Sequence, residues 1–164
     1  LDQASVMLLL GDNIFFGNTF ENRLAQVAQF SSGATVFSIP HRQPGNYGVV
    51  ELGPSQEIFS LEEKPQQPKS DQVITGAYIF DSRVVEFAKI LHPSDRGETE
   101  MIDLLRCYQK QDELHVESLG EGTNWFDAGT PQMLLEASLA IATTQREQGL
   151  IGCPHHTAKS KEWV

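Results

Sequence analysis

The sequence contains few cysteines and no apolar run long enough to cross a membrane. Its two cysteines, Cys107 and Cys153, form no CxxC pair and lie at no metal-ligand spacing, which is typical of reduced thiols in a cytoplasmic protein. No segment approaches the roughly 20 consecutive apolar residues that a membrane helix requires. The start, Leu1-Asp2-Gln3, lacks the basic residues and the cleavage site of a signal peptide. We therefore expect a cytoplasmic protein with no membrane partner.

Basic residues are also scarce. Lys and Arg total 12 against 22 Asp and Glu, which gives a formal net charge of -10 at pH 7. An acidic surface repels polyphosphate, so this composition argues against DNA, RNA and anionic membranes as partners. A small anionic ligand would need a local Lys or Arg, a metal ion or a helix N-terminus to hold it.

The composition is otherwise that of an ordinary globular domain. Hydrophobic residues make up 40% of the 164 positions and charged residues 21%, enough apolar material to fill a core. The length predicts one domain over residues 1–164.

The order of apolar patterns predicts a mixed α/β fold. Strands are expected over residues 6–10, 34–39, 47–52, 57–63, 73–80 and 114–119, and helices over 19–28, 98–110 and 130–148, with one more starting near 82. Thr19 and Thr130 are the expected N-caps. The strand–helix–strand order at the start predicts parallel pairing. We expect a three-layer sandwich with helices on both faces of a mixed, largely parallel sheet.

Asp12 directly follows the apolar strand 6–10. In open α/β sheets, ligands bind beyond the carboxyl ends of the strands, and Mg²⁺ prefers one or two carboxylates together with substrate phosphates. Asp12 is therefore a candidate metal ligand. The alternative is ordinary turn chemistry, because Gly11-Asp12-Asn13 is also a typical turn sequence.

A charged pair ends the strand 57–63. Glu63 continues the apolar face of Leu61, and a buried carboxylate needs a partner. Lys64 follows it, so the pair could hold a sugar hydroxyl and a sugar phosphate; solvated charges at a strand end are the alternative. Gly48 and Gly76 lie in or beside strands, where glycine marks either the close approach of a ligand or a bulge.

Trp125 and Asp127 precede the helix that Thr130 is expected to cap. The indole could pack against a sugar or a base, and the alternative is a core tryptophan beside a turn aspartate. His155 and His156 have no partner at zinc-like spacing, which favours a solvated pair.

Taken together, these motifs resemble one enzyme family. The segments that carry the resemblance are Leu10-Gly11-Asp12-Asn13, Ser32-Gly33-Ala34-Thr35, Tyr47-Gly48-Val49-Val50, Ser60-Leu61-Glu62-Glu63-Lys64-Pro65, Thr75-Gly76, Arg96-Gly97-Glu98 and Trp125-Phe126-Asp127-Ala128-Gly129-Thr130. Their order and spacing resemble those of bacterial glucose-1-phosphate thymidylyltransferases, of the sugar nucleotidyltransferase family, over nearly the whole chain. The resemblance implies a truncated, Rossmann-like nucleotide-diphospho-sugar transferase fold.

The resemblance also implies an activity and a set of site residues. Members of the family make dTDP-glucose and pyrophosphate from dTTP and glucose 1-phosphate with Mg²⁺, for dTDP-rhamnose and polysaccharide biosynthesis, as homo-oligomers. It implies that Asp12 and Asp127 hold the metal and that Lys64 holds the sugar phosphate, these three being the catalytic residues. The implied sugar-binding residues are Asn13, Tyr47, Gly48, Glu63, Ile74, Gly76, Tyr78, Arg96 and Trp125.

One family element is not found in the sequence. No GxGxxG or GxxxxGK run is present, although a glycine-rich loop lets backbone N–H groups approach phosphates. The resemblance implies that the amino-terminal third, which carries this loop, is missing, so we expect sugar binding but negligible turnover by this chain alone. Two alternatives stay open: a related uridylyl-, cytidylyl- or adenylyltransferase, and a non-catalytic module for sugar-phosphate binding or assembly.

Overall fold

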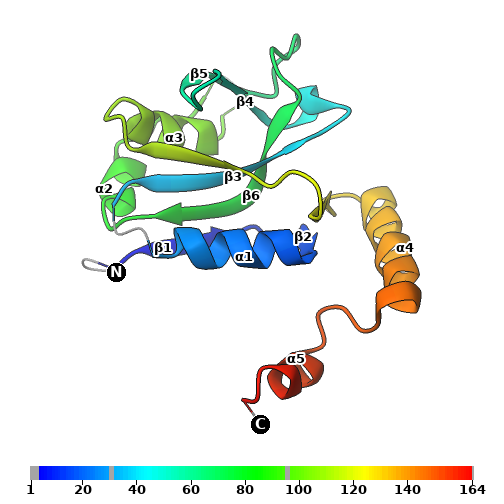
Figure 1. Ribbon diagram of the computed structural model, residues 1–164. Coiled ribbons are helices and arrows are strands. Elements are labelled where there is room, and N and C mark those ends of the chain that lie inside the picture. The colour runs from blue at the N-terminus through cyan, green and yellow to red at the C-terminus, as the bar shows by residue number, and fades with distance from the viewer. Residues whose placement is uncertain (1–3, 30–31, 95–96, 164) are drawn as a thin grey trace.

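The computed structural model describes residues 4–29, 32–94 and 97–163. In chain order the elements are β1 (Val6–Leu9), β2 (Asn13–Phe16), α1 (Asn18–Val27), β3 (Ala34–Pro40), the 3-10 turn η1 (Pro44–Asn46), β4 (Gly48–Leu52), β5 (Ile58–Glu63), β6 (Gln72–Phe80), α2 (Val84–Lys89), α3 (Met101–Gln109), β7 (Leu114–Ser118), β8 (Asn124–Asp127), α4 (Pro131–Gln148) and α5 (Pro154–Ser160). The strands form one body, from which α4 and α5 extend toward the carboxyl terminus (Figure 1).

The main sheet is organised around β6, its longest strand. The strand order is β5-β4-β6-β3-β7, and β1 also pairs with β6. Strand β3 runs along one edge of β6 from Phe80 to Gln72. On the other edge, β1 pairs with the second half of β6 and β4 pairs with it at Val73. The end of β1 therefore reaches the middle of β6, where a polar site can form.

The expected parallel pairing is wrong for most of this sheet. Strands β1 and β3 run in the same direction, as their strand–helix–strand order predicts, but each is antiparallel to β6, which lies between them. Among the described strand pairs only β3 and β7 are parallel. The mixed α/β class is confirmed, and the largely parallel sheet is corrected to a mostly antiparallel one. An apolar run shows that a strand is buried but not which strand will insert beside it.

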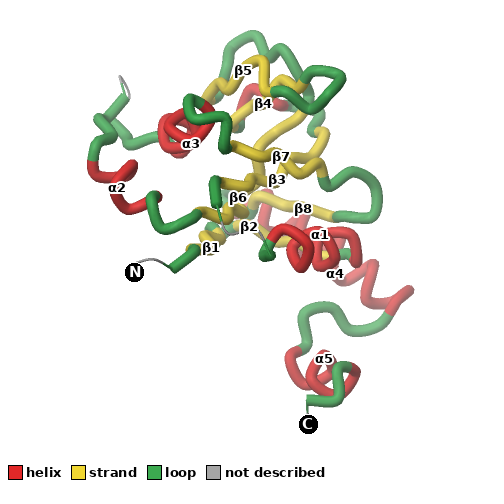
Figure 2. The backbone as a smooth tube through the Cα atoms, turned by 60° about the vertical axis from the view of Figure 1, so that its left-hand side comes forward, coloured by secondary structure: helices red, strands yellow, loops and turns green. Residues whose placement is uncertain are grey.

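Helices cover both faces of the sheet, as expected. On β3 the side chains alternate, so Val36 packs against Leu105 and Tyr108 of α3. Phe37, one position later, packs on the opposite face with Val27 of α1. Figure 2 shows α2 and α3 on one side of the strands and α1 on the other. Period-two alternation thus supplies two apolar cores from one strand.

Three local features differ from the sequence-based expectations. Residues expected to form a loop make β2, which pairs with β8 in a separate two-stranded sheet. Helix α1 begins at Asn18 after Gly17, so Thr19 is not its N-cap, and the Thr19 hydroxyl instead donates to the Glu121 carbonyl at 3.3 Å. Exposed His155 and His156 lie in the unexpected short helix α5.

Helix α4 confirms its expected start but packs loosely. Thr130 caps it by accepting from Met133 N at 3.2 Å, and Pro131 occupies the first turn. Ala137 is its only buried residue among those described. Neither α4 nor any other described helix combines the length and apolar character needed to cross a membrane.

Candidate functional site

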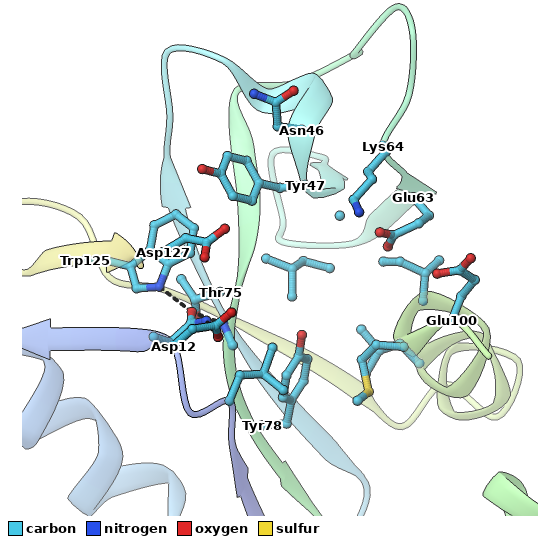
Figure 3. A pocket seen from close by; sticks show the side chains of 18 of the residues that line it. Asp12, Asn46, Tyr47, Glu63, Lys64, Thr75, Tyr78, Glu100, Trp125 and Asp127 are labelled. Atoms are coloured by element: carbon cyan, nitrogen blue, oxygen red, sulfur yellow. Dashed lines mark hydrogen bonds between the residues drawn. The ribbon is translucent and has the colours of Figure 1, made fainter. Parts of the chain in front are cut away.

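A polar cavity of about 290 Å³ opens where β1 ends beside the middle of β6. It is lined by Leu10, Asp12, Asn13, Asn46, Tyr47, Gly48, Glu63, Lys64, Ile74, Thr75, Gly76, Tyr78, Glu98, Glu100, Met101, Ile102, Leu105, Trp125 and Asp127. Figure 3 draws most of these residues, and their side chains converge from several elements on one hollow. The cavity brings together every site residue expected from the sequence except Arg96, which lies outside the described residues.

Pairing of β2 with β8 places the two expected metal ligands together. The register sets Asn13 opposite Asp127, and Ala128 N donates to the Asp12 carbonyl at 2.7 Å. A Cβ built on Gly129 would lie 3.1 Å from Asp127 Oδ1 and 3.3 Å from Asp12 Oδ2. Both carboxylates therefore converge on one space that glycine leaves open.

This carboxylate pair fits a magnesium ion. No group of three or more His, Cys, Asp or Glu residues suited to a metal occurs in the described part of the chain. Mg²⁺ needs no such protein cage, because it usually binds through one or two carboxylates, water and substrate phosphates. Asp12 and Asp127 could supply this carboxylate share of the coordination shell.

Aromatic rings form the wall next to the carboxylates. Tyr47 and Trp125 meet edge to face with ring centroids 5.3 Å apart, and His41 contacts both rings at 4.9 and 6.1 Å. Partial burial, and secondly the negative charge of Asp127, raise the pKa of the Tyr47 hydroxyl. Tyr47 therefore stays protonated at neutral pH and can donate a hydrogen bond. His41 was not anticipated from the sequence, where no motif distinguishes it.

The opposite wall carries Glu63 and Lys64 at the end of β5. Glu63 pairs in register with Gly48, and a Cβ on Gly48 would lie 3.1 Å from Ile102 Cδ1 and 3.5 Å from Glu63 Oε2. Lys64 has a positive φ of 43°, and its backbone N donates to the Tyr47 carbonyl at 3.0 Å. Figure 3 shows the Lys64 ammonium beside the Glu63 carboxylate, facing the hollow. The strand-end charges are thus part of a pocket.

Lys64 is the only Lys or Arg among the described lining residues, whereas five carboxylates line the same cavity: Asp12, Glu63, Glu98, Glu100 and Asp127. Burial, and secondly the charge of Glu63, raise the pKa of the Tyr78 hydroxyl, so it too remains a donor. Glu98 and Glu100 were not expected as site residues, and Glu100 accepts from Ser94 Oγ at 2.7 Å. A ligand here meets one cation, hydroxyl donors and many oxygen acceptors, which suits a phosphorylated sugar and a divalent metal.

Comparison with known proteins identifies the family. A family model described as nucleotidyl transferase matches residues 1–144. The chain belongs to the nucleotidyl transferase family. A glucose-1-phosphate thymidylyltransferase of Neisseria gonorrhoeae is 46% identical to this chain over 165 aligned residues. The alignment covers 100% of this chain and 57% of the relative. A thymidylyltransferase of Xanthomonas campestris is 41% identical, with 96% and 54% covered.

Solved structures agree on the fold. A Bacillus anthracis protein described as a glucose-1-phosphate thymidylyltransferase, in complex with sucrose, aligns with a TM-score of 0.74 at 32% identity over 85% of this chain and 55% of that protein. A UDP-glucose pyrophosphorylase with bound UDP-glucose also reaches 0.74, at 18% identity, over 88% of this chain and 58% of its own. This second likeness shows the shared fold alone. The chain spans a little over half the length of the curated relatives it matches.

Proposed function

We propose that the protein containing this chain transfers a thymidylyl group from dTTP to glucose 1-phosphate, giving dTDP-glucose and pyrophosphate. The observation that carries the proposal is the single cavity that gathers Lys64, Asp12 and Asp127. Its relatives named glucose-1-phosphate thymidylyltransferase support the choice of substrates. This chain contributes the sugar-phosphate pocket and the metal carboxylates to the reaction.

The size of the cavity suits one sugar phosphate. Small-molecule sites usually measure roughly 300–1,000 Å³, and about 290 Å³ lies just below that range. A hexose phosphate suits such a small volume, whereas a nucleotide sugar is larger by a nucleoside and a second phosphate. The nucleotide therefore extends beyond the residues that line this cavity.

The reaction requires the approach of two anions. An oxygen of the sugar phosphate attacks the α-phosphorus of dTTP, a new P–O bond forms, and the bond to pyrophosphate breaks with its electron pair on the leaving group. When bound, Mg²⁺ would supply positive charge that stabilises the α-phosphate of the transferred thymidylyl group and the pyrophosphate leaving group. We propose that Asp12 and Asp127 hold this ion.

Side chains that line the cavity orient the sugar phosphate. The Lys64 ammonium holds the phosphate as a point charge, and the Glu63 carboxylate accepts from a sugar hydroxyl. Tyr47 and Tyr78 remain protonated and can donate to the ligand, and Trp125 supplies an apolar ring face for the sugar. The sugar phosphate is already an anion at neutral pH, so its attack needs no separate general base.

Calorimetry with the 164-residue chain tests the pocket. Glucose 1-phosphate binds in the presence of Mg²⁺, and Lys64→Ala weakens this binding by about ten- to a hundredfold, because a hydrogen bond to a charged group contributes roughly 1.5–3 kcal/mol. Lys69→Ala is the matched control: Lys69 pairs with Glu62 at 2.7 Å and does not line the cavity. Equal affinities of both variants for glucose 1-phosphate would remove the assigned role of Lys64.

Turnover by the complete protein tests the reaction. Pyrophosphate release from dTTP is compared with release from UTP, CTP and ATP at equal glucose 1-phosphate. We expect dTTP to be preferred. Preference for another base would assign a related uridylyl-, cytidylyl- or adenylyltransferase, and sugar-phosphate binding without any turnover would support a non-catalytic module instead.

Further expectations belong to this proposal. We propose that the reaction takes place in the cytoplasm, supplies dTDP-glucose for dTDP-rhamnose and polysaccharide synthesis, and is carried out by a homo-oligomer. The scarcity of cysteine and the net charge of -10 support a cytoplasmic protein that binds small molecules rather than nucleic acid.

A further inference from the structure

One side-chain amide joins the cavity floor, the aromatic wall and the candidate metal site. The Asn13 oxygen accepts from Trp125 Nε1 at 2.6 Å and from the Gly76 backbone N at 2.9 Å. The Asn13 nitrogen donates to Asp12 Oδ1 at 2.9 Å. Figure 3 marks the hydrogen bond that Trp125 makes at the base of the hollow.

The surrounding donors determine the orientation of this amide. The indole N–H of Trp125 and the backbone N–H of Gly76 can only donate, so the Asn13 oxygen must face them. Both lone pairs of the oxygen are then used, and the amide nitrogen is left facing Asp12. If the amide were rotated, its NH₂ group would face the two N–H donors, and neither donor would have an acceptor. The donor to the Asp12 carboxylate is therefore held in place by two partners that lie elsewhere in the fold.

The glycine at position 76 provides the space for the amide. A Cβ built on Gly76 would lie 2.5 Å from Asn13 Cγ and 2.7 Å from both Nδ2 and Oδ1. These distances are far shorter than van der Waals contact, so any side chain at position 76 displaces the amide. Glycine is therefore needed in the middle of β6, because the Asn13 side chain occupies the space that a Cβ would fill.

We propose that Asn13 is a positioning residue, which orients Asp12 for the metal and the Trp125 indole for the sugar through one carboxamide. The inference rests on the proposed function, because it assigns Asp12 to a metal site. Residues that hydrogen-bond to a metal ligand fix its orientation, and losing one typically weakens metal binding by about 10- to 100-fold. Asn13 is such a residue for Asp12, while Trp125 and Gly76 keep Asn13 in place.

A purely structural role for Asn13 makes different predictions. If the amide only filled space under the cavity, its removal would lower stability without changing metal affinity or the surroundings of Trp125 in the protein that remains folded. A positioning role changes both properties in the folded protein. The test must therefore report on Asp12 and Trp125 directly, and not on stability alone.

The first measurement uses Trp125 as its own reporter. The sequence has two tryptophans, and Trp163 is 71% exposed near the carboxyl terminus, so Trp163→Phe leaves Trp125 as the sole emitter. In that background Asn13→Ala shifts the emission maximum and increases quenching by acrylamide, because the indole N–H loses its acceptor. Asn124→Ala is the control: Asn124 is exposed and adjacent to Trp125 in β8, and its removal leaves the emission unchanged.

The second measurement uses Mn²⁺ alone, without sugar or nucleotide, with free Mn²⁺ counted by electron paramagnetic resonance. Binding to the unsubstituted chain is abolished by Asp12→Asn and weakened about 10- to 100-fold by Asn13→Ala. Binding that does not depend on Asp12 overturns the proposed metal site. Binding that depends on Asp12 but is unchanged in Asn13→Ala overturns the positioning role, so the two failures are distinguishable.

A double-mutant cycle tests the geometry through position 76. Gly76→Ala lowers the melting temperature, shifts Trp125 emission and weakens Mn²⁺ binding, because the methyl group displaces the amide. In the Asn13→Ala background the same methyl group enters vacated space, so its effects on all three quantities become much smaller. Equal effects of Gly76→Ala in both backgrounds would show that the amide and the glycine are not coupled and would overturn the inference.

Discussion

Asp81 joins three parts of the chain through one buried carboxylate. It directly follows β6 and accepts from Gly33 N at 2.8 Å, from Arg83 Nε at 2.9 Å and from the Tyr108 hydroxyl at 3.1 Å. Burial alone acts to raise the pKa of Asp81, but the hydrogen bonds from Arg83, Gly33 and Tyr108 together outweigh it, and the pKa is lowered. The ionised form is therefore stabilised by the fold.

Because the folded-state pKa lies below the ordinary value of about 3.8, the contribution of Asp81 to stability is present above that value. It is lost as the pH falls through the lowered pKa. We expect Asp81→Asn to lower the free energy of unfolding at pH 7 by about 2–4 kcal/mol. Urea titrations between pH 7 and 3 give the free energy of unfolding of both proteins, and the difference between these free energies becomes smaller below about pH 4. A difference in free energy of unfolding that stays constant over this pH range would contradict the stabilising role of the ionised Asp81 carboxylate.

Gly17 is required by both its backbone and its surroundings. Its φ is 116°, and a Cβ at this position would lie within van der Waals overlap of the Gly122 carbonyl oxygen. We expect Gly17→Ala to cost on the order of 2–4 kcal/mol in urea-induced unfolding. The matched control is Gly11→Ala, since a Cβ there meets no atom within 4 Å, and it changes stability by less than about 0.5 kcal/mol. Equal losses of stability in Gly17→Ala and Gly11→Ala would contradict the close approach of Gly17 to Gly122.

At the scale of single residues, the positions that the motifs indicated come together in one cavity. Every described residue expected from the motifs lines the cavity, including Ile74 and Gly48, which carry no charge that could have indicated a site. It did not predict His41 or Glu100, because a single ring or carboxylate in a loop has no distinguishing pattern. It also did not predict that the Asn13 amide would occupy the space beside Gly76, since that contact depends on strand register.

Among the elements, α4 is a helix whose start the sequence marks and which buries little of its own surface. Thr130→Ala removes the side-chain acceptor of Met133 N, which costs about 1 kcal/mol of local helix stability. We expect faster amide exchange in the first turns of α4, with little change in global unfolding because α4 buries only Ala137. Thr143→Ala, at an exposed mid-helix position, leaves exchange unchanged or slower because alanine is the better helix former. Equal acceleration in both variants would contradict the cap.

The cap of α4 and the hairpin could be predicted because their signals are local, although the same kind of signal at Thr19 was wrong for α1. The hairpin of β4 and β5 and the cap of α4 formed as expected, since a turn or a cap depends on residues that are near in sequence. Strands β2 and β8 were not expected as a pair. Each has four residues, and such short strands become recognisable only when their partner, more than a hundred positions away, is in place.

At the scale of the whole molecule, β1 presents exposed apolar side chains beside a strand edge that no described strand covers. Met7 is 42% exposed and Leu9 52%, and within the described residues β6 is the only strand that pairs with β1. An unpaired strand edge with apolar side chains favours association with another chain. The open edge is thus a candidate contact surface for the homo-oligomer that the family resemblance implies.

We expect the chain to self-associate at neutral pH in spite of its net charge of -10. Leu9→Lys places a charge on the open edge and shifts the mass measured by light scattering toward the monomer. Ile90→Lys is the control, because Ile90 is also exposed, at 64%, but is the C-cap of helix α2 and belongs to no strand. A monodisperse monomer before any substitution would contradict the role of β1.

The sequence by itself determined the family, the start of α4 and the hairpin of β4 and β5, and it indicated polar residues that line the cavity, because motifs and local patterns act over a few neighbouring positions. Only the tertiary structure decided that β6 lies between β1 and β3, and that Asn13 meets Trp125, 112 positions away. Strand direction and register depend on which apolar faces pack together across the whole chain. The convergence of Asp12 and Asp127 beside Gly129 follows from that packing and from no local signal.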